Sequence, residues 1–136
     1  MVDQESVAVG KERFKGKSIL IVDDDPDIVA AIQTAFAETG ADLATARDGQ
    51  AAMNLAAERD PDLIILDIMM PKKGGLMVLE KLKKVRGGRP HIIMITGNTG
   101  NRHQSYAEAM GADAYLRKPV AMEILLDTAQ KVLAKD

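Results

Sequence analysis

The sequence predicts an α/β domain in which a parallel β-sheet is covered by helices on both faces. Short apolar, β-branched segments alternate five times with amphipathic segments of helical length. This alternation is typical of βα units, whose crossover connections place helices on the two sides of a sheet. Polar residues collect where the apolar segments end, and glycine or proline marks many of the boundaries.

Length and composition fit one domain with its own core. The chain has 136 residues, of which 46% are hydrophobic and 28% are charged. The formal net charge of −2 provides no basis for binding nucleic acid or an anionic membrane through overall charge. No apolar stretch approaches the roughly 20 residues of a membrane-spanning helix, and the lack of cysteine excludes disulfides and thiolate catalysis. We therefore expect a soluble, cytoplasmic protein with no direct nucleic-acid contact and no membrane insertion.

The expected domain occupies residues 18–136. Residues 1–17 are polar, show no clear periodicity and have no signal-peptide core, so we expect a flexible N-terminal arm. A native docking segment and a remnant of cloning are the alternatives for this arm. The basic residues between Lys81 and Arg89 are expected to form a solvated helix face.

The first helix has the clearest start and stop signals. Asp25 can cap the free N–H groups of a helix that begins at Pro26, and Gly40 is expected to stop it. Asp48 can cap the next, alanine-rich helix in the same way. The later helices are expected at residues 49–58, 76–86, 102–110 and 121–134. The last of them is expected to bury Ile124, Leu125, Ala129, Val132 and Leu133.

The strand that leads into Asp67 is central to the functional interpretation. Four apolar residues, Leu63 to Leu66, run directly into this carboxylate, and such a run suits a strand that is buried on both faces. In open parallel sheets, ligands bind at the carboxyl ends of the strands. The other strands are expected at residues 18–22, 43–46, 91–95 and 113–117.

Five polar residues fall at the carboxyl ends of the expected strands. They are Asp23, Asp24, Asp67, Thr96 and Lys118. Three carboxylates at one sheet edge would repel each other, and Mg²⁺ would relieve that repulsion. Carboxylates, metal, hydroxyl and amine together fit phosphoryl transfer, in which Asp67 could act as a carboxylate nucleophile. Taken singly, the aspartates could be caps, Thr96 an ordinary strand residue and Lys118 a surface charge.

The motifs around these residues resemble those of a known family, the receiver domains of two-component response regulators. The resemblance covers about residues 17–135 and implies a flavodoxin-like, doubly wound sheet of five parallel strands in the order 2-1-3-4-5. The matching motifs are Ile21-Val22-Asp23-Asp24-Asp25, Leu66-Asp67-Ile68-Met69-Met70-Pro71 with Gly75-Leu76, Ile95-Thr96-Gly97, and Gly111-Ala112-Asp113-Ala114-Tyr115-Leu116-Arg117-Lys118-Pro119.

The resemblance implies a phosphoacceptor and a metal site. Asp67 is expected to accept a phosphoryl group from a sensor histidine kinase or a histidine phosphotransfer protein. Asp24 is expected to bind Mg²⁺ directly, Asp23 through water, and Met69 through its backbone carbonyl, together with Asp67. A receiver domain is a signalling domain that takes part in its own phosphorylation, not an enzyme with a separate substrate.

The resemblance also implies a switch. Lys118 is expected to pair with the acceptor carboxylate and then with the phosphoryl oxygens, and the Lys118–Pro119 peptide is expected to be cis. Thr96 is expected to be the switch hydroxyl and Tyr115 the aromatic residue that turns inward when Thr96 moves. The face formed by residues 102–110, 113–117 and 121–134 would then be read by a downstream target or by a second copy of the chain.

Two other functions remain as alternatives. The pair Asp23 and Asp25 resembles the nucleophile motif of haloacid-dehalogenase-type phosphatases, although that interpretation leaves Asp67 unexplained. The second alternative is an interaction module of the same fold that is not phosphorylated.

The chain ends soon after Pro119, so we expect no output domain within it. It is then expected to be either a stand-alone receiver or a piece of a larger regulator or hybrid kinase.

Overall fold

The five strands form one parallel sheet. The computed structural model of the chain describes residues 12–68, 74–86, 90–97 and 101–134. The strand order is β2-β1-β3-β4-β5 and every neighbouring pair is parallel, which confirms the expected fold class. The strands are β1 (Ser18–Val22), β2 (Asp42–Ala46), β3 (Leu63–Asp67), β4 (His91–Thr96) and β5 (Ala114–Arg117).

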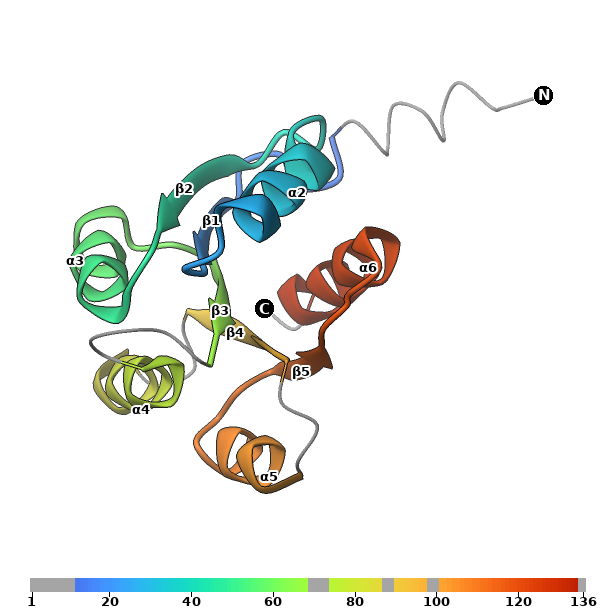
Figure 1. The fold of residues 1–136 in the computed structure, drawn as a ribbon. Helices are drawn as coiled ribbons and strands as arrows, with labels where there is room; N and C mark the ends of the chain where they lie inside the picture. Colours follow the sequence, from blue (N-terminus) through green and yellow to red (C-terminus); the bar gives the residue numbers. More distant parts are fainter. Residues whose placement is uncertain (1–11, 69–73, 87–89, 98–100, 135–136) are drawn as a thin grey trace.

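Helices cover both faces of this sheet. Figure 1 shows α2 and α6 on one face and α3, α4 and α5 on the other. The helices are α2 (Pro26–Phe36), α3 (Gly49–Arg59), α4 (Gly75–Arg86), α5 (Asn101–Ala109) and α6 (Met122–Leu133). The bounds of α3 to α6 lie within one residue of the expected ones.

The sheet separates the core into two hydrophobic clusters. Side chains alternate between the two faces of a strand, so Ile64 and Leu66 join the cluster beneath α3, α4 and α5, which we call the α3–α5 cluster. Leu63 and Ile65 join the cluster beneath α2 and α6, which we call the α2–α6 cluster. Every residue of β3 and β4 is buried, which explains why the sequences of these two strands are almost continuously apolar.

Both expected aspartate caps are present. The side chain of Asp25 accepts a hydrogen bond from the N–H of Asp27, and that of Asp48 accepts one from the N–H of Ala51. The helix α2 ends at Phe36, however, several residues before Gly40. Gly40 instead has a left-handed backbone with φ +82°, and a Cβ there would lie 3.1 Å from the Cα of Lys15.

Residues 12–17 pack against the domain, although we assigned them to the flexible arm. The side chain of Phe14 is 2% exposed and its ring centroid lies 5.4 Å from that of Phe36. The N–H of Phe14 donates a hydrogen bond to the carbonyl of Thr39. One aromatic residue in a polar segment produces no periodic pattern, so this contact had no signature in the sequence. The remainder of the arm, residues 1–11, lies outside the described residues.

Arg13 ties the same segment to the last helix. Its guanidinium donates hydrogen bonds to Asp127 (Nη2 to Oδ1, 2.5 Å) and to Gln130 (Nε to Oε1, 2.6 Å). The guanidinium also lies over the ring of Phe14, 5.6 Å from its centroid. Residues 12–17 therefore contact α6 through the hydrogen bonds of Arg13 and α2 through the ring of Phe14.

Ile124 differs from the expectation for α6. Its side chain is 55% exposed, whereas Leu125, Ala129, Val132 and Leu133 are buried as expected. The buried residues are spaced by three or four positions and therefore share one face of the helix. Ile124 precedes that set by one position, which rotates it by about 100° toward solvent.

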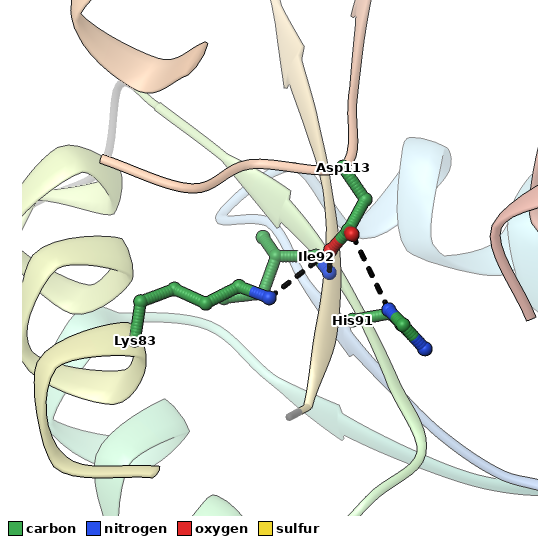
Figure 2. A network of polar contacts seen from close by, with 4 residues as sticks. All are labelled: Lys83, His91, Ile92 and Asp113. Carbon is green, nitrogen blue, oxygen red and sulfur yellow. Dashed lines mark hydrogen bonds and ion pairs between the residues drawn. The ribbon is translucent and has the colours of Figure 1, made fainter. Parts of the chain in front are cut away.

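A partly buried polar network holds α4 against the loop before β5 (Figure 2). One carboxylate oxygen of Asp113, Oδ2, accepts hydrogen bonds from the N–H of Ile92 at 2.8 Å and from Nζ of Lys83 at 3.1 Å. The other, Oδ1, lies 3.3 Å from Nδ1 of His91. Burial of Asp113 acts to raise its pKa, but the Ile92, Lys83 and His91 contacts outweigh it, and the pKa is lowered. The side chain of Lys83 is only 8% exposed, so the expected solvated basic face was wrong for this residue.

Candidate functional site

Three carboxylates meet at the carboxyl edge of the sheet. Asp23 and Asp24 follow β1, and Asp67 ends the neighbouring strand β3. Oxygen atoms of the three side chains lie within 4.8 Å of one another. Asp23 and Asp67 are buried, while Asp24 is exposed. The sequence-based expectation that these residues converge is therefore met by the geometry.

Lys118 supplies a positive charge to this cluster. Its Nζ lies 3.0 Å from Oδ2 of Asp23 and 3.6 Å from Oδ2 of Asp67. Partial burial acts to lower the pKa of Lys118, but the hydrogen bond to Asp23 and the charges of Asp67, Asp23 and Asp24 outweigh it and raise that pKa. The ammonium is thus held in its charged form between two buried carboxylates. The Lys118–Pro119 peptide is cis, as the family resemblance implied.

Backbone hydrogen bonds position the side chains of the cluster. The N–H of Asp23 donates to the carbonyl of Ala46 at the end of β2, and Oδ1 of Asp23 accepts from the N–H of Asp25 at 2.9 Å. The N–H of Lys118 donates to the carbonyl of Thr96 at 2.8 Å. The residues that follow β1 and β5 are therefore held by the ends of their neighbouring strands.

Thr96 and Tyr115 lie on the adjacent strands β4 and β5. Thr96 is fully buried, and Tyr115 is opposite Met94 in the β4–β5 register. The hydroxyl of Tyr115 is enclosed by protein but makes no hydrogen bond of ordinary length and angle. Burial raises the pKa of Tyr115 by more than the Arg117 charge and the nearby Thr96 hydroxyl lower it. Thr96 is thus close enough to influence the Tyr115 hydroxyl electrostatically.

The residues present fit a hard divalent cation. Mg²⁺ is bound in proteins by one or two carboxylates, carbonyl oxygens and several waters. Asp24 is open to solvent and could keep such waters, while Asp23 and Asp67 present oxygens from the buried side of the cluster. The fourth expected ligand, the Met69 carbonyl, lies outside the described residues.

The phosphatase alternative receives no support from the geometry. It requires Asp23 and Asp25 to act together. The side chain of Asp25 is instead engaged as the cap of α2, where its Oδ1 accepts from the N–H of Asp27 at 2.9 Å. Asp25 is also absent from the carboxylate cluster, which is completed by Asp67.

A cavity beside Lys118 had no clear signal in the sequence. It has a volume of about 450 Å³ and lies between α2 and the segment that joins β5 to α6. Its lining includes Ile28 and Ile32 of α2, Ile95 of β4, and Lys118 with Val120. Ile28 and Ile32 share one face of α2, and only the packed structure shows that part of this face borders an open cavity.

Comparison with known proteins gives a consistent result. The family profile of the response regulator receiver domain matches residues 19–130. Among curated proteins, the alkaline phosphatase synthesis transcriptional regulatory protein PhoP of Bacillus subtilis is 38% identical over 103 residues, which are 76% of this chain and 42% of PhoP. The response regulator SaeR of Staphylococcus epidermidis is 37% identical over 117 residues, covering 86% of this chain and 50% of SaeR. The chain therefore spans about half the length of these relatives.

Solved structures agree in fold. A CheY-like receiver domain protein of Methanospirillum hungatei has a TM-score of 0.83 and 31% identity, covering 88% of this chain and 94% of that one. The BeF3-activated N-terminal receiver domain of Klebsiella pneumoniae RstA has a TM-score of 0.79 and 28% identity, covering 85% and 97%. In the described part of this chain, no helix has the length and apolar character needed to cross a membrane. The chain belongs to the family of response regulator receiver domains of two-component systems.

Proposed function

We propose that this domain accepts a phosphoryl group on the carboxylate of Asp67. The observation that carries the proposal is the meeting of three carboxylates and one ammonium at a single sheet edge. Buried carboxylates at such short separation are costly unless positive charge accompanies them. Lys118 provides one positive charge, and the cluster retains an exposed member, Asp24, through which a cation and a phosphodonor can approach.

Mg²⁺ is the proposed cofactor. Asp23, Asp24 and Asp67 would hold it, with the Met69 carbonyl as a further candidate ligand. When bound, it supplies charge that offsets the negative charge of the phosphoryl oxygens. The proposal is supported by the donor set, because carboxylate oxygens are the ligands that this hard cation prefers.

The transfer step takes the phosphoryl group from a histidine nitrogen of the phosphodonor to Asp67, with Mg²⁺ bound at the cluster. An oxygen of the Asp67 carboxylate attacks phosphorus, and the bond between phosphorus and the donor nitrogen breaks with its electron pair left on that nitrogen. The product is an acyl phosphate on Asp67. Lys118 lies close enough to follow the charge from the carboxylate to the phosphoryl oxygens, and the hydroxyl of Thr96 is the candidate donor of a hydrogen bond to one of them.

The proposed output is a change of the α5–β5–α6 face. A phosphoryl group adds up to two negative charges and three acceptor oxygens, which would draw Thr96 toward Asp67. Tyr115 would then adjust, because its enclosed hydroxyl lies in the electrostatic reach of Thr96. A downstream target or a second copy of the chain would read the altered face.

The proposed phosphodonor is a sensor histidine kinase or a histidine phosphotransfer protein. The mostly apolar cavity beside Lys118 offers a place where apolar side chains of such a donor could pack. A donor seated there would bring its histidine to the edge of the sheet that carries Asp67. The cavity therefore supports docking between α2 and the start of α6.

Intact mass spectrometry tests the proposed acceptor. The protein is incubated with Mg²⁺ and acetyl phosphate, and wild type is compared with Asp67→Asn and Asp25→Asn. Asp25→Asn is the matched control, because it also replaces an aspartate by asparagine, two residues from Asp23 of the cluster. Asparagine functions as well as aspartate at the cap position that Asp25 occupies.

We expect one labile phosphoryl adduct, which is hydrolysed in base as an acyl phosphate is, on wild type and on Asp25→Asn, and none on Asp67→Asn. Omission of Mg²⁺ should suppress the adduct. An adduct of equal yield on Asp67→Asn would refute the assignment of the acceptor. Absence of any adduct on wild type would instead favour an interaction module that does not depend on phosphorylation.

A further inference from the structure

Gly75 lies in unusually close contact with the backbone of the acceptor strand. A Cβ atom added at this position would lie 2.1 Å from the carbonyl oxygen of Asp67, 2.7 Å from the Cα of Ile68 and 2.8 Å from the carbonyl carbon of Asp67. These neighbours are all main-chain atoms, so they cannot move aside as the tip of a flexible side chain would. The first residue of α4 thus touches the end of β3 at a distance that leaves no room for a side chain.

The need for glycine here is steric and not conformational. The glycines with positive φ in the described chain are Gly16, Gly40 and Gly111, and neither Gly75 nor its neighbour Gly74 is among them. Alanine could therefore adopt the backbone conformation at either position. At Gly74 a Cβ would meet only the carbonyl oxygen of Ile68, at an ordinary 3.7 Å. The two adjacent glycines consequently differ in the space that a side chain would find.

The contact fixes the peptide that carries Asp67. The N–H of Gly75 donates a hydrogen bond to the carbonyl of Ile68 at 2.9 Å. From the other side, the N–H of Ile68 donates to the carbonyl of Ile95 on β4 at 3.1 Å. The main chain at Asp67 and Ile68 is therefore held between β4 and the start of α4, while the Asp67 carboxylate must remain with Asp23 and Asp24 in the cluster.

We propose that Gly75 is a positioning residue for the acceptor carboxylate of Asp67. Any side chain at this position would separate α4 from β3 and displace the peptide that follows Asp67. The carboxylate would move with its own main chain, out of register with Asp23, Asp24 and Lys118. This inference rests on the proposed function of Asp67, and its test has a readout that does not depend on phosphorylation.

The test compares Gly75→Ala with the matched control Gly74→Ala. In Gly75→Ala the contact with the Asp67 carbonyl must open from 2.1 Å to at least 3.0 Å. A displacement of about 1 Å at a reacting group lowers rates by about a hundredfold. The measured quantity is the rate of adduct formation from acetyl phosphate per folded molecule. We expect this rate to fall by about that factor in Gly75→Ala and to stay near the wild-type rate in Gly74→Ala.

The second readout is the backbone amide NMR spectrum in the absence of phosphodonor and Mg²⁺. Displacement predicts that the Asp67 and Ile68 amide resonances shift in Gly75→Ala and remain in place in Gly74→Ala. An unchanged adduct rate in folded Gly75→Ala would overturn the inference, and so would a slower rate with unshifted amides. If wild type forms no adduct, the proposed function fails, and the amide shifts alone decide whether Gly75 positions this peptide.

Wild-type protein provides the test if Gly75→Ala does not fold. The hydrogen bond from Gly75 to Ile68 predicts that the Gly75 amide exchanges with solvent about as slowly as the Ile68 amide, which is bonded within the sheet. Similar protection of both amides would support the close contact. Rapid exchange at Gly75 beside a protected Ile68 would overturn the inference.

Discussion

The partly buried network around Asp113 makes a quantitative prediction about stability. The substitution Asp113→Asn keeps the size of the side chain and one acceptor oxygen, but removes the negative charge. Lys83, whose side chain is 8% exposed, would then retain its ammonium 3.1 Å from an uncharged partner. Removing one member of a buried ion pair costs about 3–5 kcal/mol. Because asparagine can still accept the hydrogen bond from Ile92, we expect a loss of about 2–3 kcal/mol in the free energy of unfolding.

Urea unfolding at pH 7 provides the measurement, with Lys83→Met and the double variant completing a mutant cycle. In the Lys83→Met background the cost of Asp113→Asn should fall by about 1–2 kcal/mol, because the ion pair between Asp113 and Lys83 is already absent there. Asp127→Asn is the control, since that carboxylate is 58% exposed and should cost less than about 1 kcal/mol. An equal cost of Asp113→Asn in both backgrounds would refute the proposed pairing.

The same substitution predicts the direction of the pH dependence. The pKa of Asp113 is lower in the folded protein than its ordinary value because Ile92, Lys83 and His91 favour the charged form. A carboxyl group with a depressed folded pKa stabilises the protein above its unfolded pKa of about 4, and this contribution is lost as pH falls through the folded pKa. The stability difference between wild type and Asp113→Asn should therefore be largest near neutral pH and should narrow in acid.

Other substitutions test separate features of the structure. Phe14→Ala should lower the free energy of unfolding by about 3–5 kcal/mol in urea titrations, because the ring is 2% exposed and packs in the α2–α6 cluster. Arg13→Ala should cost less than about 1 kcal/mol in the same assay, because its partner Asp127 is largely exposed. Ile124→Ala should stay within about 0.5 kcal/mol of wild type, and a larger loss would contradict its exposed position. Thr96→Ala should still form the adduct in mass spectra, while binding of a downstream partner should no longer respond to it.

The order of the elements was predictable because each has its own local signal. The strand β3 is marked by four apolar residues, and α2 by the pair Asp25 and Pro26. The features that could not be predicted depend on contacts between distant segments. Phe14 precedes β1 but packs against Phe36, the last residue of α2. Lys83 forms an ion pair with Asp113, which lies thirty residues later in the chain. Neither contact leaves a periodic pattern in the sequence.

The composition of the candidate site was predictable for a topological reason. Parallel strands bring their carboxyl ends to one edge, so the residues that end or directly follow β1, β3, β4 and β5 were expected to be neighbours. The distances within the site were not predictable. Lys118 lies nearer to Asp23 than to Asp67, at 3.0 Å compared with 3.6 Å, although the family resemblance led us to expect the acceptor as its partner. Such preferences are set by side-chain packing, which motif spacing does not describe.

The division of the core by the sheet has a consequence for how this domain tolerates change. Buried side chains contact members of their own cluster, and the sheet stands between the α3–α5 cluster and the α2–α6 cluster. Paired substitutions such as Val78 with Ala107 should therefore be coupled in free energy, whereas Val78 with Val132 should be nearly additive. Each half of the interior can thus accumulate compensating replacements on its own.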